Sequence, residues 1–147
     1  MKALSLSQPW LWAVLYAGKH VENRSWPPPI DMIEQRIALH AAKSWDDDAI
    51  SFFIKLGIEH PHRKDLYTAG AIVGVATIDR VVTTDKTIAD DQKRWFFGEY
   101  GWLLKDVRPL KSPIPATGRQ KLWTMSPEIE GAVMLQLGLA TLAEAGA

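Results

Sequence analysis

Four side chains able to hold a phosphate or move a proton lie within six positions, from Lys19 to Arg24. Side chains alternate between the two faces of an extended segment, so Glu22 and Arg24 share one face with His20. Along a strand the first two are about 7 Å apart, close enough to pair or to grip one polar ligand together. A structural ion pair at a sheet edge and a ligand-binding pair both fit this spacing.

The strand predicted over residues 36–41 carries the next candidates. Because histidine is a common general acid and base, His40 could form an acid–base pair with Glu22; a hydrogen-bonded structural histidine is the alternative. Lys43 follows two residues beyond the strand. For Lys19, a contact with carbonyls at the end of a helix and a contact with a phosphate are the two interpretations.

Alternating and helical patterns predict the elements that would position these groups. A helix over residues 8–18 is expected to end at Gly18, which leads directly into the motif. A second helix is predicted over residues 45–57 and a third over residues 127–142. The predicted strands span residues 2–6, 21–26, 36–41, 71–82, 100–105 and 120–125.

Five to six strands with helices at the periphery predict the α+β class and one small barrel. The chain has 147 residues and neither an internal repeat nor a composition break, so one domain over residues 1–147 is expected. Its 17 basic residues balance its 17 acidic residues, which gives no general argument for nucleic acid. A local basic stretch does occur between Lys105 and Lys121.

Several classes of protein are disfavoured by composition. The chain has no cysteine, which excludes disulfides and thiolate chemistry. His60 and His62 lack a clear carboxylate partner, so neither a metal nor a cofactor is predicted. We expect no membrane span and no secretory signal, and therefore a cytoplasmic protein.

Several stretches of the sequence form a set of motifs. They are Leu4-Ser5-Leu6-Ser7-Gln8-Pro9-Trp10, Gly18-Lys19 with Glu22, Arg24 and Trp26, the strands at residues 36–43 and 70–76, and Lys121-Leu122-Trp123. Taken together, these motifs resemble the ASCH domain family of the PUA-like superfamily, over about residues 2–125. The chain is similar in style to the C-terminal domain of activating signal cointegrator. The resemblance implies a PUA-like β-barrel with helices beside a cleft.

The same resemblance implies a module that binds nucleic acid through this cleft, with RNA favoured and DNA open. Cationic side chains would meet phosphates and an aromatic side chain would stack on a base. The predicted binding residues are Lys19, Glu22, Arg24, Trp26, His40 and Lys43.

Hydrolysis of RNA or of a modified nucleoside is the alternative function. Some small ASCH proteins hydrolyse the amide of acetylcytidine with a lysine, a threonine and a glutamate, and the family includes ribonucleases. Lys19 matches that lysine, whereas Glu22 stands where the threonine is expected and supplies no hydroxyl nucleophile. An enzyme of this type would use Glu22, assisted by Lys19 or His40.

Overall fold

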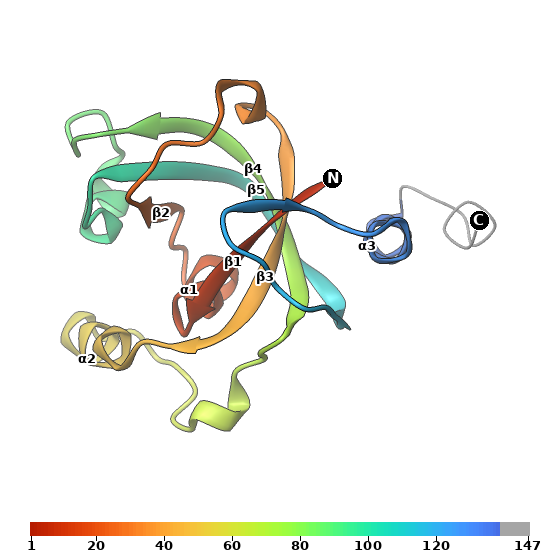
Figure 1. Cartoon of the computed structure of the whole chain (residues 1–147). Helices are drawn as coiled ribbons and strands as arrows, with labels where there is room; N and C mark the ends of the chain where they lie inside the picture. The colour runs from red at the N-terminus through yellow and green to blue at the C-terminus, as the bar shows by residue number, and fades with distance from the viewer. Residues whose placement is uncertain (139–147) are drawn as a thin grey trace.

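The computed structural model describes residues 1–138 of the chain. These residues contain six strands, three α-helices and three short 3-10 turns, joined by loops (Figure 1). The strands are β1 (Lys2–Gln8), β2 (Val21–Arg24), β3 (Arg36–Trp45), β4 (Ala71–Val82), β5 (Tyr100–Pro115) and β6 (Leu122–Thr124). The helices are α1 (Trp10–Tyr16), α2 (Asp47–Leu56) and α3 (Pro127–Gln136). The turns are η1 (Ile30–Met32), η2 (Lys64–Leu66) and η3 (Asp90–Trp95).

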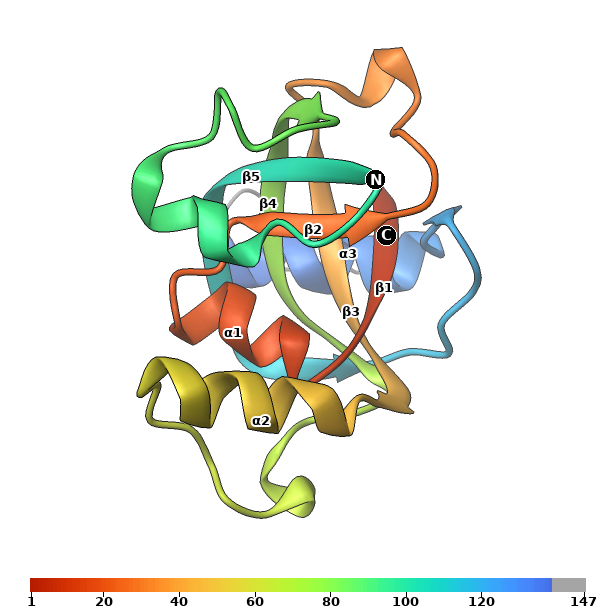
Figure 2. The same cartoon turned by 90° about the vertical axis from the view of Figure 1, so that its left-hand side faces the viewer.

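All six strands belong to one sheet, in the order β2-β5-β4-β3-β1-β6. Only β1 and β3 run parallel; the other neighbours are antiparallel. The predicted α+β class is therefore confirmed. Closure into a barrel is not, because β2 and β6 remain as the two edges of the hydrogen-bonded sheet. The sheet curls strongly nonetheless, and the end of β2 lies beside β1 (Figure 2).

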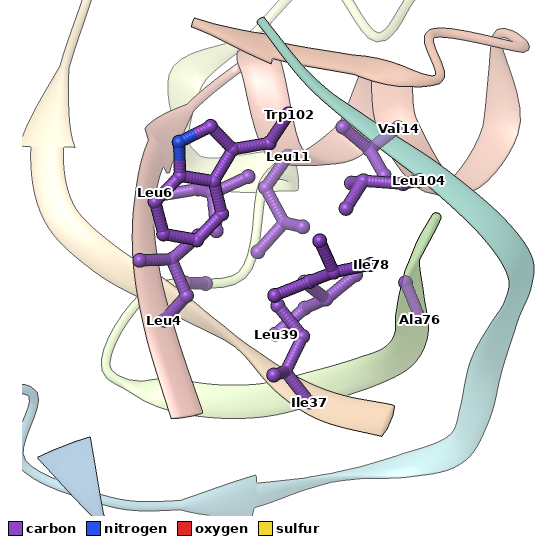
Figure 3. Packing of buried hydrophobic residues seen from close by; sticks show 11 residues of the cluster. Leu4, Leu6, Leu11, Val14, Ile37, Leu39, Ala76, Ile78, Trp102 and Leu104 are labelled. Carbon is purple, nitrogen blue, oxygen red and sulfur yellow. The ribbon is translucent and has the colours of Figure 1, made fainter. Parts of the chain in front are cut away.

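Strict alternation along β1 and β3 builds two layers of packing. Leu4 and Leu6 of β1 join Ile37 and Leu39 of β3 in an inner cluster, which is closed by the fully buried Trp102 of β5 (Figure 3). Because neighbouring residues of a strand point to opposite faces, the residues between these lie on the outer face of the sheet.

The outer face is covered by the third helix. Ala3 and Ala38 pack there with Val133 and Leu137 from α3 and its end. Figure 1 shows α3 on the opposite side of the sheet from α1. Ser5 and His40 are register partners on β1 and β3, and alternation puts their side chains on this same outer face.

The first helix is shorter than the predicted span of residues 8–18. Gln8 stays in the sheet, where it pairs with Trp45, so α1 begins only at Trp10. After α1 ends at Tyr16, Gly18 adopts a left-handed conformation with φ of 72° and turns the chain towards β2.

The fifth strand continues past the point where prolines predicted its end. It was expected to stop at residue 105, but β5 runs on to Pro115 through Pro109 and Pro113. The reason is that β2 pairs with β5 only as far as Leu103, so the rest of β5 has β4 as its only strand neighbour in the described structure. A proline is tolerated there because one side of the strand needs no backbone donor.

The helix predicted over residues 127–142 is confirmed in its first part. It ends at Gln136, and Gly138 has a φ of 72°, which favours glycine and terminates the helix. Residues 139–142 lie outside the described residues. No helix within residues 1–138 is long and apolar enough to cross a membrane.

Removal of a side chain from the inner cluster should destabilise the fold. Leu39 is completely buried, so Leu39→Ala should lower the free energy of unfolding by about 2–5 kcal/mol. Ile30 is 91% exposed and provides the control, since Ile30→Ala should change stability by less than about 0.5 kcal/mol. Urea unfolding measures both, and equal effects would contradict this description of the core.

Candidate functional site

Glu22 lies between two cations at the edge of the sheet. Its Oε2 is 3.0 Å from Arg24 Nη2 and accepts a hydrogen bond from Arg24 Nε at 3.1 Å. Its Oε1 is 3.5 Å from Lys19 Nζ. Glu22 and Arg24 therefore lie on the same face of β2, as the alternation of side chains along a strand predicted, and they pair with each other.

Lys19 is buried beneath this carboxylate, with 1% of its surface exposed. Its ammonium donates to the backbone carbonyl of Val21 and lies 5.5 Å from the centre of the Trp10 ring. Burial lowers the pKa of Lys19, and the charge of Glu22 opposes that shift. Lys19 is thus a partner of Glu22 in the interior and lines none of the hollows described below.

Arg24 connects two strands that are not neighbours in the sheet. Besides its contacts with Glu22, Arg24 Nη2 donates to the backbone carbonyl of Ser5 at 2.6 Å. Ser5 lies on β1, whereas Arg24 ends β2, which hydrogen-bonds only to β5 within the sheet. One guanidinium therefore holds the edge strand against β1.

Three adjoining hollows form a groove that starts at this point. The first, about 210 Å³, is lined by Ser7, Trp10, Glu22 and Arg24 among others. The second, about 500 Å³, shares Ser5, Ser7 and Arg24 with the first. The third, about 840 Å³, shares Ser5, Ala42, Arg119 and Gln120 with the second and adds His40 and Lys43. We refer to these three hollows together as the groove.

His40 faces the groove but does not contact Glu22. One ring nitrogen, Nδ1, is 3.0 Å from Ser5 Oγ, and the other, Nε2, is 2.8 Å from the carbonyl of Ala116. The side chain is 2% exposed and packs edge-on against Trp123. The predicted acid–base pair of His40 with Glu22 is not formed, because both ring nitrogens are bonded to other groups.

The remaining two predicted residues lie along the groove. Trp26 lines its second hollow, is half-buried, and packs edge-on against Trp102 with 4.8 Å between the ring centres. Lys43 is exposed and lines the third hollow. Residues 22–26 and the end of β3 are separate in sequence, but both line the groove.

The sequence patterns did not predict one wall of the groove. Thr117, Arg119, Gln120 and Lys121 line the groove from the segment between β5 and β6. The only signal for it was the basic stretch that ends at Lys121. Lys105, at the start of that stretch, does not line the groove, because it pairs with Glu34 and Asp79.

Comparison with family models identifies the class to which this fold and groove belong. The model of the ASCH domain matches residues 4–137. The chain therefore belongs to the ASCH domain family, as the motifs predicted. A comparison with curated proteins gave no match.

Solved structures of the same family have the same fold. A crystal structure of ASCH from Zymomonas mobilis matches with a TM-score of 0.56 and 17% identity, over 91% of this chain and 93% of that chain. A tyrosine-to-phenylalanine variant of that protein matches with a TM-score of 0.54 and 17% identity, over 91% and 96% of the two chains. A serine-to-alanine variant matches with a TM-score of 0.52 and 18% identity, over 92% and 94%.

Replacement of the buried lysine should change how stability depends on pH. Because burial lowers the pKa of Lys19 in the folded protein, the unfolded chain holds more protons between that lowered pKa and the ordinary value of 10.5. The free energy of unfolding of the wild type should therefore rise with pH in this window relative to that of Lys19→Met. Urea unfolding at a series of pH values measures the difference, and a difference that does not vary with pH would refute the assignment.

Proposed function

We propose that this protein binds single-stranded nucleic acid, RNA in preference to DNA, in the groove that runs from Glu22 to Lys43. The main support for this proposal is the positive charge of the side chains that line the groove. In the described residues, the charged groups that line the groove are cations, with the single exception of Glu22, which is already paired. A chain with no net charge thereby presents a locally basic depression, which suits a phosphate backbone.

Three cations are available for phosphates. Lys43, Arg119 and Lys121 are exposed, and within residues 1–138 none of them forms an ion pair. A cation without a partner keeps its full attraction for a ligand, whereas a paired one such as Lys105 has to give up an existing interaction.

Arg24 and Trp26 serve the proposal at the other end of the groove. The guanidinium of Arg24 uses Nε and Nη2 internally, and a guanidinium carries further N–H donors. Trp26 is half-buried, so part of its indole is open for stacking on a base. Lys19 and Glu22 act indirectly here, because they hold Arg24 in place and Lys19 itself is not accessible.

The preference for RNA rests on polar groups between the cations. Ser7, Thr117 and Gln120 line the groove with hydroxyl and amide groups that can hydrogen-bond a ribose 2′-hydroxyl or the edge of an unpaired base. A depression lined from both sides also fits a single strand better than the rigid outer surface of a duplex.

Removal of the three free cations should weaken binding and its dependence on salt. For Lys43→Ala combined with Arg119→Ala and Lys121→Ala, the slope of log K against log salt should fall by on the order of 2, at about 0.7 for each phosphate contact with a single strand. Fluorescence anisotropy with an RNA oligonucleotide, its DNA counterpart and duplex DNA measures affinity and preference.

The matched control removes three exposed cations elsewhere, at Lys55, Arg63 and Lys86. This variant has the same net charge but an intact groove, so its slope should stay near that of the wild type. If both triple variants lose the same affinity and slope, the groove is not the binding site.

Hydrolysis of RNA or of a modified nucleoside such as acetylcytidine is the second candidate, and the burial of Glu22 supports it. A carboxylate beside a buried lysine of lowered pKa, at the bottom of a small hollow, is an arrangement typical of functional sites. Glu22 would accept a proton from water or from a ribose hydroxyl, while Lys19 stabilises its charge. His40 has no contact with Glu22 through which it could take part.

Glu22→Gln tests this candidate by removing the base at nearly constant size. Turnover of an RNA oligonucleotide and of acetylcytidine should fall at least about 100-fold. The substitution leaves Lys19 without its counter-charge, so a loss of stability of about 3–5 kcal/mol is also expected, and turnover has to be normalised to the folded fraction. Full activity of the folded variant would eliminate the hydrolytic candidate.

A further inference from the structure

The segment of residues 116–121 contacts two side chains of the sheet. His40 Nε2 lies 2.8 Å from the carbonyl of Ala116, and Ser5 Oγ lies 3.3 Å from the carbonyl of Arg119. Ala116 also donates its N–H to the carbonyl of Gly70. The 116–121 segment, which forms one wall of the groove, thus has its position set by β1 and β3.

The pair of Ser5 and His40 resembles a nucleophile with its base, but the surroundings of the hydroxyl argue against that role. Ser5 Oγ has three polar neighbours, namely His40 Nδ1 at 3.0 Å, Trp123 Nε1 at 3.2 Å and the carbonyl of Arg119 at 3.3 Å. Trp123 Nε1–H donates to the hydroxyl oxygen, and the three neighbours together with the Cβ of Ser5 surround it. No direction is left for attack on a substrate.

The same contacts determine the proton position on His40. A carbonyl oxygen only accepts, so the contact with Ala116 requires the proton to be on Nε2. In the neutral ring, Nδ1 then accepts from the hydroxyl of Ser5. The imidazole is therefore a bridge between β1 and the 116–121 segment.

Gly118 lies so close to this bridge that no side chain fits. A Cβ at this position would lie 2.5 Å from His40 Cε1 and 2.8 Å from Ser5 Oγ. The backbone of the 116–121 segment can rest on the imidazole only because residue 118 is a glycine.

We propose that the 116–121 segment is the phosphate-binding element of the groove and that His40, Ser5 and Gly118 position it without touching the ligand. The inference rests on the proposed function, since it names the part of the groove that holds the nucleic-acid backbone. Arg119 and Lys121 supply the charge on this wall, and Lys43 lines the same groove.

The backbone of the segment adds donors to these charges. In the described structure, the N–H groups of residues 117–121 donate to no other backbone group. Main-chain N–H groups are common phosphate ligands in complexes with nucleic acids. Residues 117–120 line the third hollow and Lys121 lines the second, so these N–H groups belong to residues of the groove wall.

Gly118→Ala is the sharpest test. The new methyl group has to displace the segment from His40, so affinity for a single-stranded RNA oligonucleotide should fall by about tenfold or more, as expected for the loss of a charge-assisted hydrogen bond. The salt slope should fall by about 1.4, the contribution of the two cations of the segment. Thermal unfolding of the variant is measured alongside and should show a folded protein.

Gly98→Ala is the matched control. A Cβ there would make only an ordinary contact of 3.7 Å with Asn23, so this variant should bind RNA as the wild type does. Wild-type binding by Gly118→Ala, with an unchanged salt slope, would overturn the inference while leaving the proposed function intact. Absence of RNA binding by the wild type would instead overturn the proposed function itself.

Substitutions of His40 separate positioning from chemistry. His40→Gln retains an amide donor that can reach the carbonyl of Ala116, whereas His40→Leu retains none. We expect the glutamine variant to recover most of the affinity and salt slope, and the leucine variant to match Gly118→Ala. Equal binding by the wild type and the leucine variant would refute the positioning role.

Discussion

The ion pairs of the Glu22 carboxylate with Lys19 and Arg24 are the interaction on which the shape of the groove side depends. A buried charge is strongly unfavourable unless it is paired and hydrogen-bonded. Here one carboxylate oxygen of Glu22 pairs with Lys19 and the other pairs with Arg24. Lys19 is fully removed from water and therefore has a lowered pKa. Because Arg24 also donates to the carbonyl of Ser5, the same ion network joins β2 to β1.

This contact between β2 and β1 explains how an open sheet stays curled around its hydrophobic core. β2 hydrogen-bonds only to β5 within the sheet, yet the guanidinium of Arg24 keeps its end against β1. The inner cluster of aliphatic side chains around Trp102 fills the space enclosed by the curl. The groove begins between β2 and β1, where the hydrogen bond of the Arg24 side chain takes the place of backbone hydrogen bonds. A long arginine side chain leaves more room between two strands than direct backbone pairing does.

Local arrangement of charge matters more here than its sum. The chain has as many basic as acidic residues, but tertiary contacts place some of the bases in ion pairs and others beside the groove. Lys19 and Lys105 are used in ion pairs with acidic residues. Lys43, Arg119 and Lys121 remain exposed beside one depression, so an electrostatic attraction for phosphates is concentrated there.

Much of the fold and part of the site follow from local patterns in the sequence. Alternation in residues 21–24 predicted that Glu22 and Arg24 share a face, and apolar alternation in residues 36–41 predicted the inward face of β3. The nearly continuous apolar run of residues 71–82 predicted the central strand β4 with the bounds that it has. Such patterns are readable because a strand repeats every two residues, whatever lies around it.

Other features were decided only by the tertiary structure. The prolines of β5 predicted an end to the strand, but the short length of β2 leaves that side of β5 without a strand partner and so makes the prolines harmless. The sequence left Lys19 open between a contact with helix-end carbonyls and a contact with a phosphate, whereas packing of α1 against β1 and β5 buries it beneath Glu22. His40 pairs with Ser5 and not with Glu22 because β1 and β3 are neighbours in parallel register. These outcomes depend on contacts between residues far apart in the chain, and a local pattern carries no information about such contacts.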